Sequence, residues 1–477
     1  MRNALLLAGL FIALTPHAHS QAKIGTGSVK SLYDDNCSAC HGKEMEGGAS
    51  VSLVDDEWIH GSDDKTITRI IREGVTGTSM QGYADVLNSE QIRSLVVLIT
   101  EYKSIAKSAA QKPMVAGADG VRKSDLHTFK LEHLFDAPGT MWGLDFLPDG
   151  SMLVTQKAGK LWHSKDGKKL SEISGIPEAW VNGQGGLLDV QVHPDYERNG
   201  WVYLSYAEHT GAMDNGRKAG MTAIARGRIS NGKWTDSEVV FRFPEELHVS
   251  SGAHFGSRIV FKDGLLHFSV GDRGNQDSAQ DLSAPSGKIH RITADGHIPR
   301  DNPFLKTKDA LPSIFSYGNR NPQGLAFNPE TGALWETEHG PRGGDELNVI
   351  ESGHNYGWPK VTFGINYNGR PISDLTHADG ITPPLTHWTP SIAIAGMDFY
   401  AGDKFPEWQG HLFLGGMSAE ELYRIETKGK TVVNQELVLK GEGRIRDVVT
   451  GPDGHIYLLL NSKGSKSGKI ARLVPAK

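Results

Sequence analysis

Short strand-like runs separated by tight turns recur along most of this chain. They are clearest in "MWGLDFLPDGSMLVTQKAGKLWHS", "RIVFKDGLLHFSVGD", "GLAFNPETGALWETEHG" and "DVVTGPDGHIYLLLNS". Each stretch places a glycine-containing turn between runs rich in β-branched, aromatic and other apolar residues, as in a β-hairpin. Repetition at intervals of about 60 residues over about 350 residues is typical of a β-propeller with about six blades. A pair of β-sandwiches or another all-β barrel is the alternative that the spacing alone leaves open.

Charge and the N-terminal residues restrict the class of protein further. The 477 residues carry a formal net charge of -6, and the sequence pI is near 6.4, which does not favour nucleic-acid binding. An apolar run from Ala4 to Leu14 follows a basic residue, and "SQA" at 20–22 has small residues where a signal peptidase cleaves. That run is too short to span a bilayer. We expect a signal peptide over residues 1–22, a periplasmic or secreted protein and no membrane span, with an N-terminal anchor as the alternative.

Both cysteines of the chain lie in one motif. The stretch "DDNCSACHGKE" contains Cys37, Cys40 and His41 in the spacing C-x-x-C-H, the attachment site of a c-type haem. The two thiols add to the haem vinyl groups, and the imidazole ligates the iron. A redox dithiol or half of a zinc site would also fit C-x-x-C, but the adjacent histidine and the export signal favour haem c. A haem held in this way usually carries electrons.

Residues 23–105 are predicted to form a small all-α domain around this haem. The stretch "NSEQIRSLVVLITEYK" has an Asn-Ser cap followed by an apolar helical face. That face consists of Ile92, Leu95, Val96 and Ile99. In the glycine-rich loop before it, Met80 is a candidate sixth ligand of the iron. Met45 competes for this role, but it lies too close to the motif to reach the opposite haem face easily.

The segment 23–105 resembles a small class I cytochrome c, in which a methionine in such a loop is the distal ligand. Residues 106–124 are rich in Ala, Lys, Gly and Ser and lack aromatic residues, which is a linker composition. The strand-rich domain is therefore assigned to residues 125–477.

Several polar patterns in the strand-rich domain are compatible with chemistry. His254 and Asp272 supply the minimum for a general base whose tautomer is fixed by a carboxylate. Arg444 and Arg446 lie two apart, on one face of an extended strand, which suits a ligand rich in carboxylates. In "ETEHGPRGGDELN", turn carbonyls and Glu346 offer hard oxygens of the kind that calcium prefers. Taken singly, each pattern also fits an ordinary polar strand or turn.

From about residue 130 to its end, the chain resembles the soluble pyrroloquinoline quinone (PQQ)-dependent glucose and aldose sugar dehydrogenases. The resemblance rests on "WGLDFLPDGSMLVTQKAGKLW", "NGQGGLLDVQVHPDY", "GAHFGSRIVF", "SVGDRG", "GNRNPQGLAF", "EHGPRGGDELN", "NYGWP" and "RIRDVVTGPDG", in the family's order. It implies a six-bladed propeller, in agreement with the hairpin spacing. The expected fold class is multidomain: an all-β six-bladed propeller preceded by a small all-α cytochrome c domain.

The resemblance also implies roles for single residues. His254 matches the general base, Asp272 the carboxylate that orients it, and Arg320 the group that polarises the quinone. The further residues matched to the cofactor or to the sugar pocket are Gln184, Gln276, Asn321, Ser391, Arg444 and Arg446. The positions matched to calcium are Gly340 and Pro341 for the ion on the quinone, and Glu346 and Tyr356 for a second ion.

Two positions depart from the family's pattern. Ser418 stands where members commonly have a lysine that contacts the cofactor, which implies weaker PQQ binding. Ala253 stands where the glucose enzymes have a sugar-binding aspartate, which puts glucose in doubt as the preferred substrate.

Together, the two domains predict a periplasmic quinoprotein dehydrogenase with PQQ, calcium and haem c. An aldose is expected to be oxidised at its anomeric carbon to a lactone, and electrons are expected to pass to the haem of the same chain. A cytochrome or copper protein would then accept them. The alternatives are a haem-plus-propeller reductase of the cytochrome cd1 type and a non-catalytic sugar-binding propeller tethered to a cytochrome. No nucleic-acid partner is expected, and the oligomeric state is left open.

Overall fold

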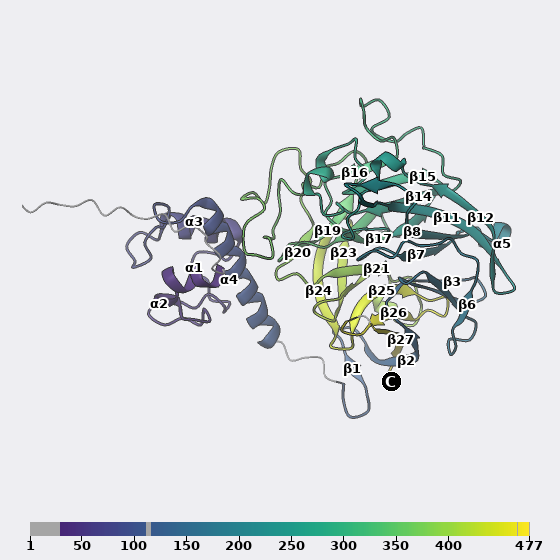
Figure 1. Ribbon diagram of the computed structural model, residues 1–477. Coiled ribbons are helices and arrows are strands. Elements are labelled where there is room, and N and C mark those ends of the chain that lie inside the picture. Colours follow the sequence, from purple (N-terminus) through teal and green to yellow (C-terminus); the bar gives the residue numbers. More distant parts are fainter. Residues whose placement is uncertain (1–28, 111–115, 465, 477) are drawn as a thin grey trace, which may run out of the picture.

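The computed structural model describes residues 29–110, 116–464 and 466–476, so the predicted signal peptide lies outside the described residues. A helical N-terminal domain lies beside a larger strand-rich domain (Figure 1). Among the helices that the structure describes, none is long and apolar enough to cross a membrane.

The N-terminal domain is built from short helices packed against one long helix. Its described helices are α1 (Val29–Asn36), α2 (Ser38–His41), α3 (Asp64–Glu73) and α4 (Ser89–Ala110). Asn88 and Gln91 form a reciprocal cap at the start of α4, with side chain to amide distances of 2.8 and 2.9 Å. The predicted apolar face of α4 lies in one core with side chains of α1 and α3. The helix continues into the predicted linker because the residues there include good helix formers such as alanine and lysine.

Six antiparallel sheets form the blades of a propeller within the described residues, which confirms the predicted fold class. The first two blades contain β3 (Met141–Phe146), β4 (Met152–Gln156), β5 (Lys160–Ser164) and β6 (Ser171–Ile173), then β7 (Leu187–Val192), β8 (Val202–Glu208), β11 (Met221–Ser230) and β12 (Lys233–Phe241). The third and fourth contain β13 (Ile259–Lys262), β14 (Leu265–Val270), β15 (Lys288–Thr293) and β16 (Ile314–Tyr317), then β17 (Pro322–Phe327), β18 (Leu334–Glu338), β19 (Asp345–Ile350) and β20 (Thr386–Trp388). The fifth contains β21 (Ile394–Phe399), β22 (Leu412–Gly416), β23 (Glu421–Lys428) and β24 (Thr431–Lys440). Outside the blades, β9 (Met213–Asp214) and β10 (Arg217–Lys218) form a small hairpin, and α5 (Tyr196–Asn199) is a single turn.

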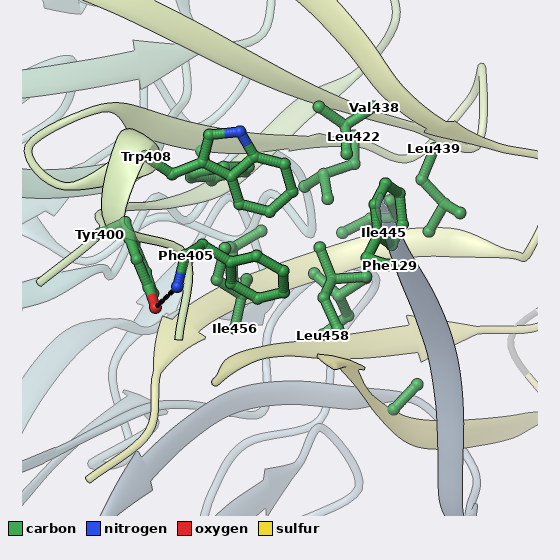
Figure 2. Close-up of a cluster of buried hydrophobic side chains, with 14 of the residues drawn as sticks. Phe129, Tyr400, Phe405, Trp408, Leu422, Val438, Leu439, Ile445, Ile456 and Leu458 are labelled. Carbon is green, nitrogen blue, oxygen red and sulfur yellow. Dashed lines mark hydrogen bonds between the residues drawn. The ribbon is translucent and has the colours of Figure 1, made fainter. Parts of the chain in front are cut away.

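The sixth blade closes the ring with strands from both ends of the domain. Its strands are β25 (Arg444–Thr450), β26 (Ile456–Asn461), β27 (Ser467–Pro475), β2 (Thr128–Pro138) and β1 (Arg122–Lys123). Phe129 of β2 is fully buried in the cluster that Figure 2 shows, where Phe405 and Trp408 stack at 4.4 Å between ring centroids. Strand β2 is thus packed into the core of the last blades. The closed ring holds the loops at both of its ends in fixed positions.

Buried aspartates join the innermost strands of neighbouring blades. Asp189 of β7 accepts a hydrogen bond from the amide of Ile259 at 2.9 Å, and Asp447 of β25 accepts one from the amide of Leu144 at 3.0 Å. Arg258 forms ion pairs with both carboxylates, at 2.8 and 3.0 Å. These bonds cross between blades, so they connect sheets that share no strand.

Candidate active site

The predicted site residues gather at one end of the propeller because the blades are antiparallel. In each blade, the innermost strand begins at the end where the second strand finishes. His254 precedes β13 and Asp272 follows β14, while Arg320 precedes β17 and Gly340 follows β18. The loops that carry them therefore open on the same face. Further predicted residues at or just before the start of an innermost strand are Gln184, Asn321, Ser391, Arg444 and Arg446.

His254 and Asp272 form the pair that the sequence predicted. Nδ1 of His254 lies 2.6 Å from Oδ1 of Asp272, and the indole nitrogen of Trp358 donates to the other carboxylate oxygen at 2.8 Å. Burial alone would raise the pKa of Asp272, but the hydrogen bond and charge of His254, the Gly274 amide and Arg320 together lower it. The ionised carboxylate then requires a proton on Nδ1, which leaves the Nε2 lone pair of His254 free to accept a proton.

The loop that carries His254 is held in an unusual conformation. His254 has φ 45°, in the left-handed region that non-glycine residues rarely adopt. Its amide donates to Oε1 of Gln184 at 3.0 Å. Behind it, the buried guanidinium of Arg273 donates to the carbonyls of Ala253 at 3.0 Å and Gly220 at 3.1 Å, and burial lowers the pKa of Arg273 to about 9. A buried cation that binds main-chain carbonyls thus positions the histidine loop.

Arg320 binds the loop after β18. Its Nη1 donates to the carbonyls of His339 at 2.9 Å and Gly340 at 2.8 Å. Oδ1 of Asp345 accepts from the amide of Gly340 at 2.9 Å and from the hydroxyl of Ser391 at 2.7 Å, and burial raises the pKa of Asp345 to about 6. A side chain at Gly340 would bring a Cβ within 2.3 Å of a main-chain oxygen, so only glycine fits. The loop is thereby fixed with its main-chain oxygens beside Arg320.

Positive charge at this face exceeds what the protein itself neutralises. Burial and two neighbouring arginines lower the pKa of Arg446 to about 9, and its buried Nε donates to no described residue. Burial and the charges of Arg446 and Arg320 hold the pKa of His339 well below its usual value, and Nε2 of His339 is also buried without a described partner. Unpartnered nitrogens beside the mutually repelling charges of Arg446 and its neighbouring arginines favour an anionic ligand rich in oxygen acceptors.

Buried acidic groups surround the position predicted for a second calcium. Glu346 of β19 lies opposite Glu338 of β18, and one small cavity is lined by Gly340, Glu346 and Tyr356 together. Burial and the charge of Glu338 raise the pKa of Glu346 well above its usual value. No described group of three or more His, Cys, Asp or Glu side chains is arranged as a metal site. A cation here would offset the buried carboxylates, but its ligands would include main-chain or amide oxygens.

The residues of the predicted haem motif lie at the junction of two short helices. Cys37 lies between α1 and α2 and Cys40 lies within α2, and both are free thiols. Nδ1 of His41 lies 2.9 Å from the carbonyl of Val51, which suits an N–H donor and leaves Nε2 for a metal. Met45 is fully buried in the core of the domain, whereas Met80 is partly exposed in the loop before α4. The ligand role of Met80 stays a prediction.

Four further residues singled out from the sequence lie in the loops and turns around the site. Asn321 accepts from the amide of Gly256 at 3.2 Å, and the Ser418 hydroxyl donates to the carbonyl of Ser391 at 3.1 Å. Gln276 begins the 3₁₀ turn η2 (Gln276–Gln280) and is partly exposed, and Pro341 is buried in the loop after β18.

Sequence reasoning did not assign roles to Arg273, His339 or Trp358. Trp358 lies in the stretch "NYGWP", one of those that carry the family resemblance, but the sequence did not predict its hydrogen bond to Asp272. Arg273 directly follows Asp272, yet nothing in the sequence shows that its partners are main-chain carbonyls. Such contacts become visible only in the folded chain.

Comparison with known proteins agrees with this geometry. Residues 135–472 match the model of the Glucose / Sorbosone dehydrogenase family, and residues 26–99 match that of Cytochrome C oxidase, cbb3-type, subunit III. Aldose sugar dehydrogenase YliI of Escherichia coli is 44% identical over 356 residues, which cover 73% of this chain and 93% of that protein.

Solved structures show the same likeness. The apo form of the soluble aldose sugar dehydrogenase of Escherichia coli aligns with a TM-score of 0.67 at 41% identity, over 73% of this chain and 100% of that one. The PQQ-bound form of an aldose sugar dehydrogenase from Streptomyces coelicolor aligns with a TM-score of 0.59 at 26% identity, over 72% of this chain and 98% of that one. The chain therefore belongs to the glucose/sorbosone dehydrogenase family and carries a cytochrome c domain at its N-terminal end.

Proposed function

We propose that this protein is a periplasmic aldose dehydrogenase that uses PQQ and calcium in the propeller and haem c in the N-terminal domain. The observation that carries the proposal is the His254–Asp272 pair beside the buried cation of Arg446 and the neutral imidazole of His339, each of which has a buried nitrogen without a described partner. PQQ carries three carboxyl groups, so it meets the need of this face for an oxygen-rich anion. Support also comes from the relatives named aldose sugar dehydrogenases, of which one is described in a PQQ-bound form.

The residues that would hold PQQ are on the described face. Arg444 and Arg446 would bind its carboxylates, and Arg320 and Asn321 would bind near the quinone. The main-chain oxygens of Gly340 and Pro341 would hold a calcium ion, with Glu346 and Tyr356 beside the second position. When bound, PQQ supplies a quinone that accepts two electrons as a hydride, and calcium polarises it.

Among the residues of the chain, His254 is the one that accepts a proton from the substrate. Ionised Asp272 keeps the proton of His254 on Nδ1, so Nε2 faces the substrate as a base. Nε2 takes the proton from the anomeric hydroxyl of the aldose while the hydrogen on the anomeric carbon leaves as a hydride. The carbon becomes the carbonyl carbon of a lactone, and the proton passes from His254 to water. Trp358 and Gln184 maintain the geometry of this pair.

Each oxidation releases two electrons, whereas one haem iron accepts one at a time between its ferric and ferrous states. A haem held by Cys37, Cys40 and His41 would supply one-electron transfer, so two successive transfers would be needed for each sugar oxidised. Two molecules of a one-electron acceptor outside the chain, such as a cytochrome or copper protein, would take up the two electrons.

The proposal is tested with full-length, haem-loaded, oxidised protein supplied with PQQ, calcium and a panel of aldoses. Haem absorbance is followed by stopped flow. Haem reduction that requires both sugar and PQQ is expected. Sugar oxidation with an added dye while the haem stays oxidised would refute the internal electron path. Failure to bind PQQ would instead favour a non-catalytic sugar-binding propeller.

Replacing Arg446 tests whether this face binds an anionic cofactor. Arg446→Met is expected to raise the Kd for PQQ by about tenfold to a hundredfold, because a charge-assisted hydrogen bond contributes about 1.5–3 kcal/mol. The same change is expected to raise the melting temperature of the cofactor-free protein, because the depressed pKa of Arg446 means that its charge is unfavourable in the folded state. Fluorescence titration and calorimetry measure the two effects.

The exposed Arg198 of α5 provides a matched control, since Arg198→Met removes the same charge in the loop between β7 and β8, at the opposite end of its blade. A loss of PQQ affinity equal to that of the control, or a lower melting temperature for Arg446→Met, would contradict the assignment.

A further inference from the structure

Helix α4 is buried around its whole circumference over residues 91–99, although the sequence predicted only one apolar face. Every residue from 91 to 99 is buried. The predicted face packs in the core of the cytochrome domain. Arg93 and Ser94 are also buried, and a helix with polar groups buried on its second face requires a partner there. The partner in the structure is the propeller domain.

The polar groups of this second face bind the long segment between β19 and β20. Nη2 of Arg93 donates to the carbonyl of Phe363 at 2.7 Å, while its Nη1 forms an ion pair with Asp64 of α3 at 2.6 Å. The hydroxyl of Ser94 donates to the carbonyl of Gly369 at 2.9 Å. Arg93 therefore links α3 and α4 to the propeller.

Two turns further along α4, Glu101 binds the active-site loop itself. Its carboxylate accepts two hydrogen bonds from Arg342, at 2.9 and 2.7 Å, and the Glu101 side chain is only 8% exposed. Arg342 lies two residues after Gly340, whose carbonyl binds Arg320. A bidentate pair between an arginine and a carboxylate fixes orientation as well as distance.

The two segments held by α4 are also bound to each other. The amides and carbonyls of Arg342 and Ile365 exchange two hydrogen bonds of 3.0 Å, and Phe363 lies two residues before Ile365. Arg93 and Glu101 thus hold adjacent parts of one structure, and that structure includes the loop that lines the candidate site.

We propose that α4 is a permanent docking element, through which Glu101 and Arg93 hold the cytochrome domain against the active-site loop. In this arrangement, the haem domain does not search for the propeller on a flexible linker but stays at one distance from it. The proposal deepens the proposed function, on which its role in electron transfer rests. The docking itself requires neither PQQ nor sugar.

The test compares Glu101→Lys, which places a cation against Arg342, and the milder Glu101→Gln with the wild-type full-length holoprotein. Glu90→Gln is the matched control, because Glu90 is exposed on the same helix. Hydrogen–deuterium exchange on the segments 91–101 and 363–371 is measured first. Slow exchange is expected in the wild type and the control, with faster exchange in Glu101→Lys and an intermediate rate in Glu101→Gln. Fast exchange already in the wild type would overturn the docking.

Sugar-driven haem reduction is then measured in the same four proteins. In Glu101→Lys we expect it to slow by at least about tenfold, because a tethered but undocked domain has a lower effective concentration. Dye-linked sugar oxidation is expected to stay unchanged, because Arg320 and Asp345 hold Gly340 of the active-site loop without any contribution from α4. Released α4 with an unchanged rate of haem reduction would overturn the electron-transfer role. Absence of dye-linked oxidation in the wild type would refute the proposed function but leave the exchange result valid.

Discussion

Replacing His254 by alanine is expected to lower kcat/KM for aldose oxidation by about 10²–10⁴, the usual contribution of a positioned general base. The affinity for PQQ and the haem content should change little, because neither depends on the proton acceptor. The loss should appear in dye-linked steady-state assays as well as in sugar-driven haem reduction, since both need the same first step. Single-turnover kinetics separate this loss from weaker sugar binding.

A substitution of Asp272 tests the same catalytic pair. Asp272→Asn removes the charge that keeps the proton of His254 on Nδ1, so we expect a large loss of kcat even though the histidine remains. His297→Ala is the control, because that histidine is 80% exposed and lies in a surface turn. If His254→Ala and His297→Ala retain equal activity, His254 is not the base.

Periodicity and composition favoured a propeller for the strand-rich domain, and the family resemblance decided between it and other all-β folds. Hairpins at regular intervals gave a propeller of about six blades, and six blades are present. The apolar face of α4 and its cap were predicted from sequence because both depend on residues close together in the chain. Closure of the last blade was not predicted, since the pairing of Phe129 with Pro475 joins opposite ends of the domain.

In the candidate site too, contacts between residues close in sequence were predicted, whereas contacts between distant residues were not. The partnership of His254 with Asp272 was proposed from type and proximity, and the structure places them 2.6 Å apart. The contacts of Glu101 with Arg342 could not be proposed, because 241 positions separate the two residues. Neither residue forms a motif, and only the packing of one domain on the other brings them together.

Removing the central cation of the propeller is expected to be the most destabilising single change. Arg258 is 8% exposed and binds Asp189 and Asp447, which are 3% and 4% exposed. Arg258→Met would leave both carboxylates buried without their cation, at a cost of about 3–5 kcal/mol. Urea unfolding followed by tryptophan fluorescence measures this loss. Arg198→Met, which breaks the exposed pair with Asp195, should change stability by less than about 0.5 kcal/mol.

The loss caused by Arg258→Met should also depend on pH. Even with Arg258 present, burial raises the pKa of Asp189 to about 7, above the value near 3.9 of an unfolded chain. A folded carboxyl with a raised pKa binds more protons than its unfolded form, so its ionisation lowers stability as pH rises through this range. Without the guanidinium the folded pKa of Asp189 rises further, and the destabilisation at pH 8 should exceed that at pH 5, where the Asp189 carboxyl is largely protonated. An equal loss at both values would mean that Arg258 acts through packing, including its position 4.5 Å from the ring of Trp142, rather than through its charge.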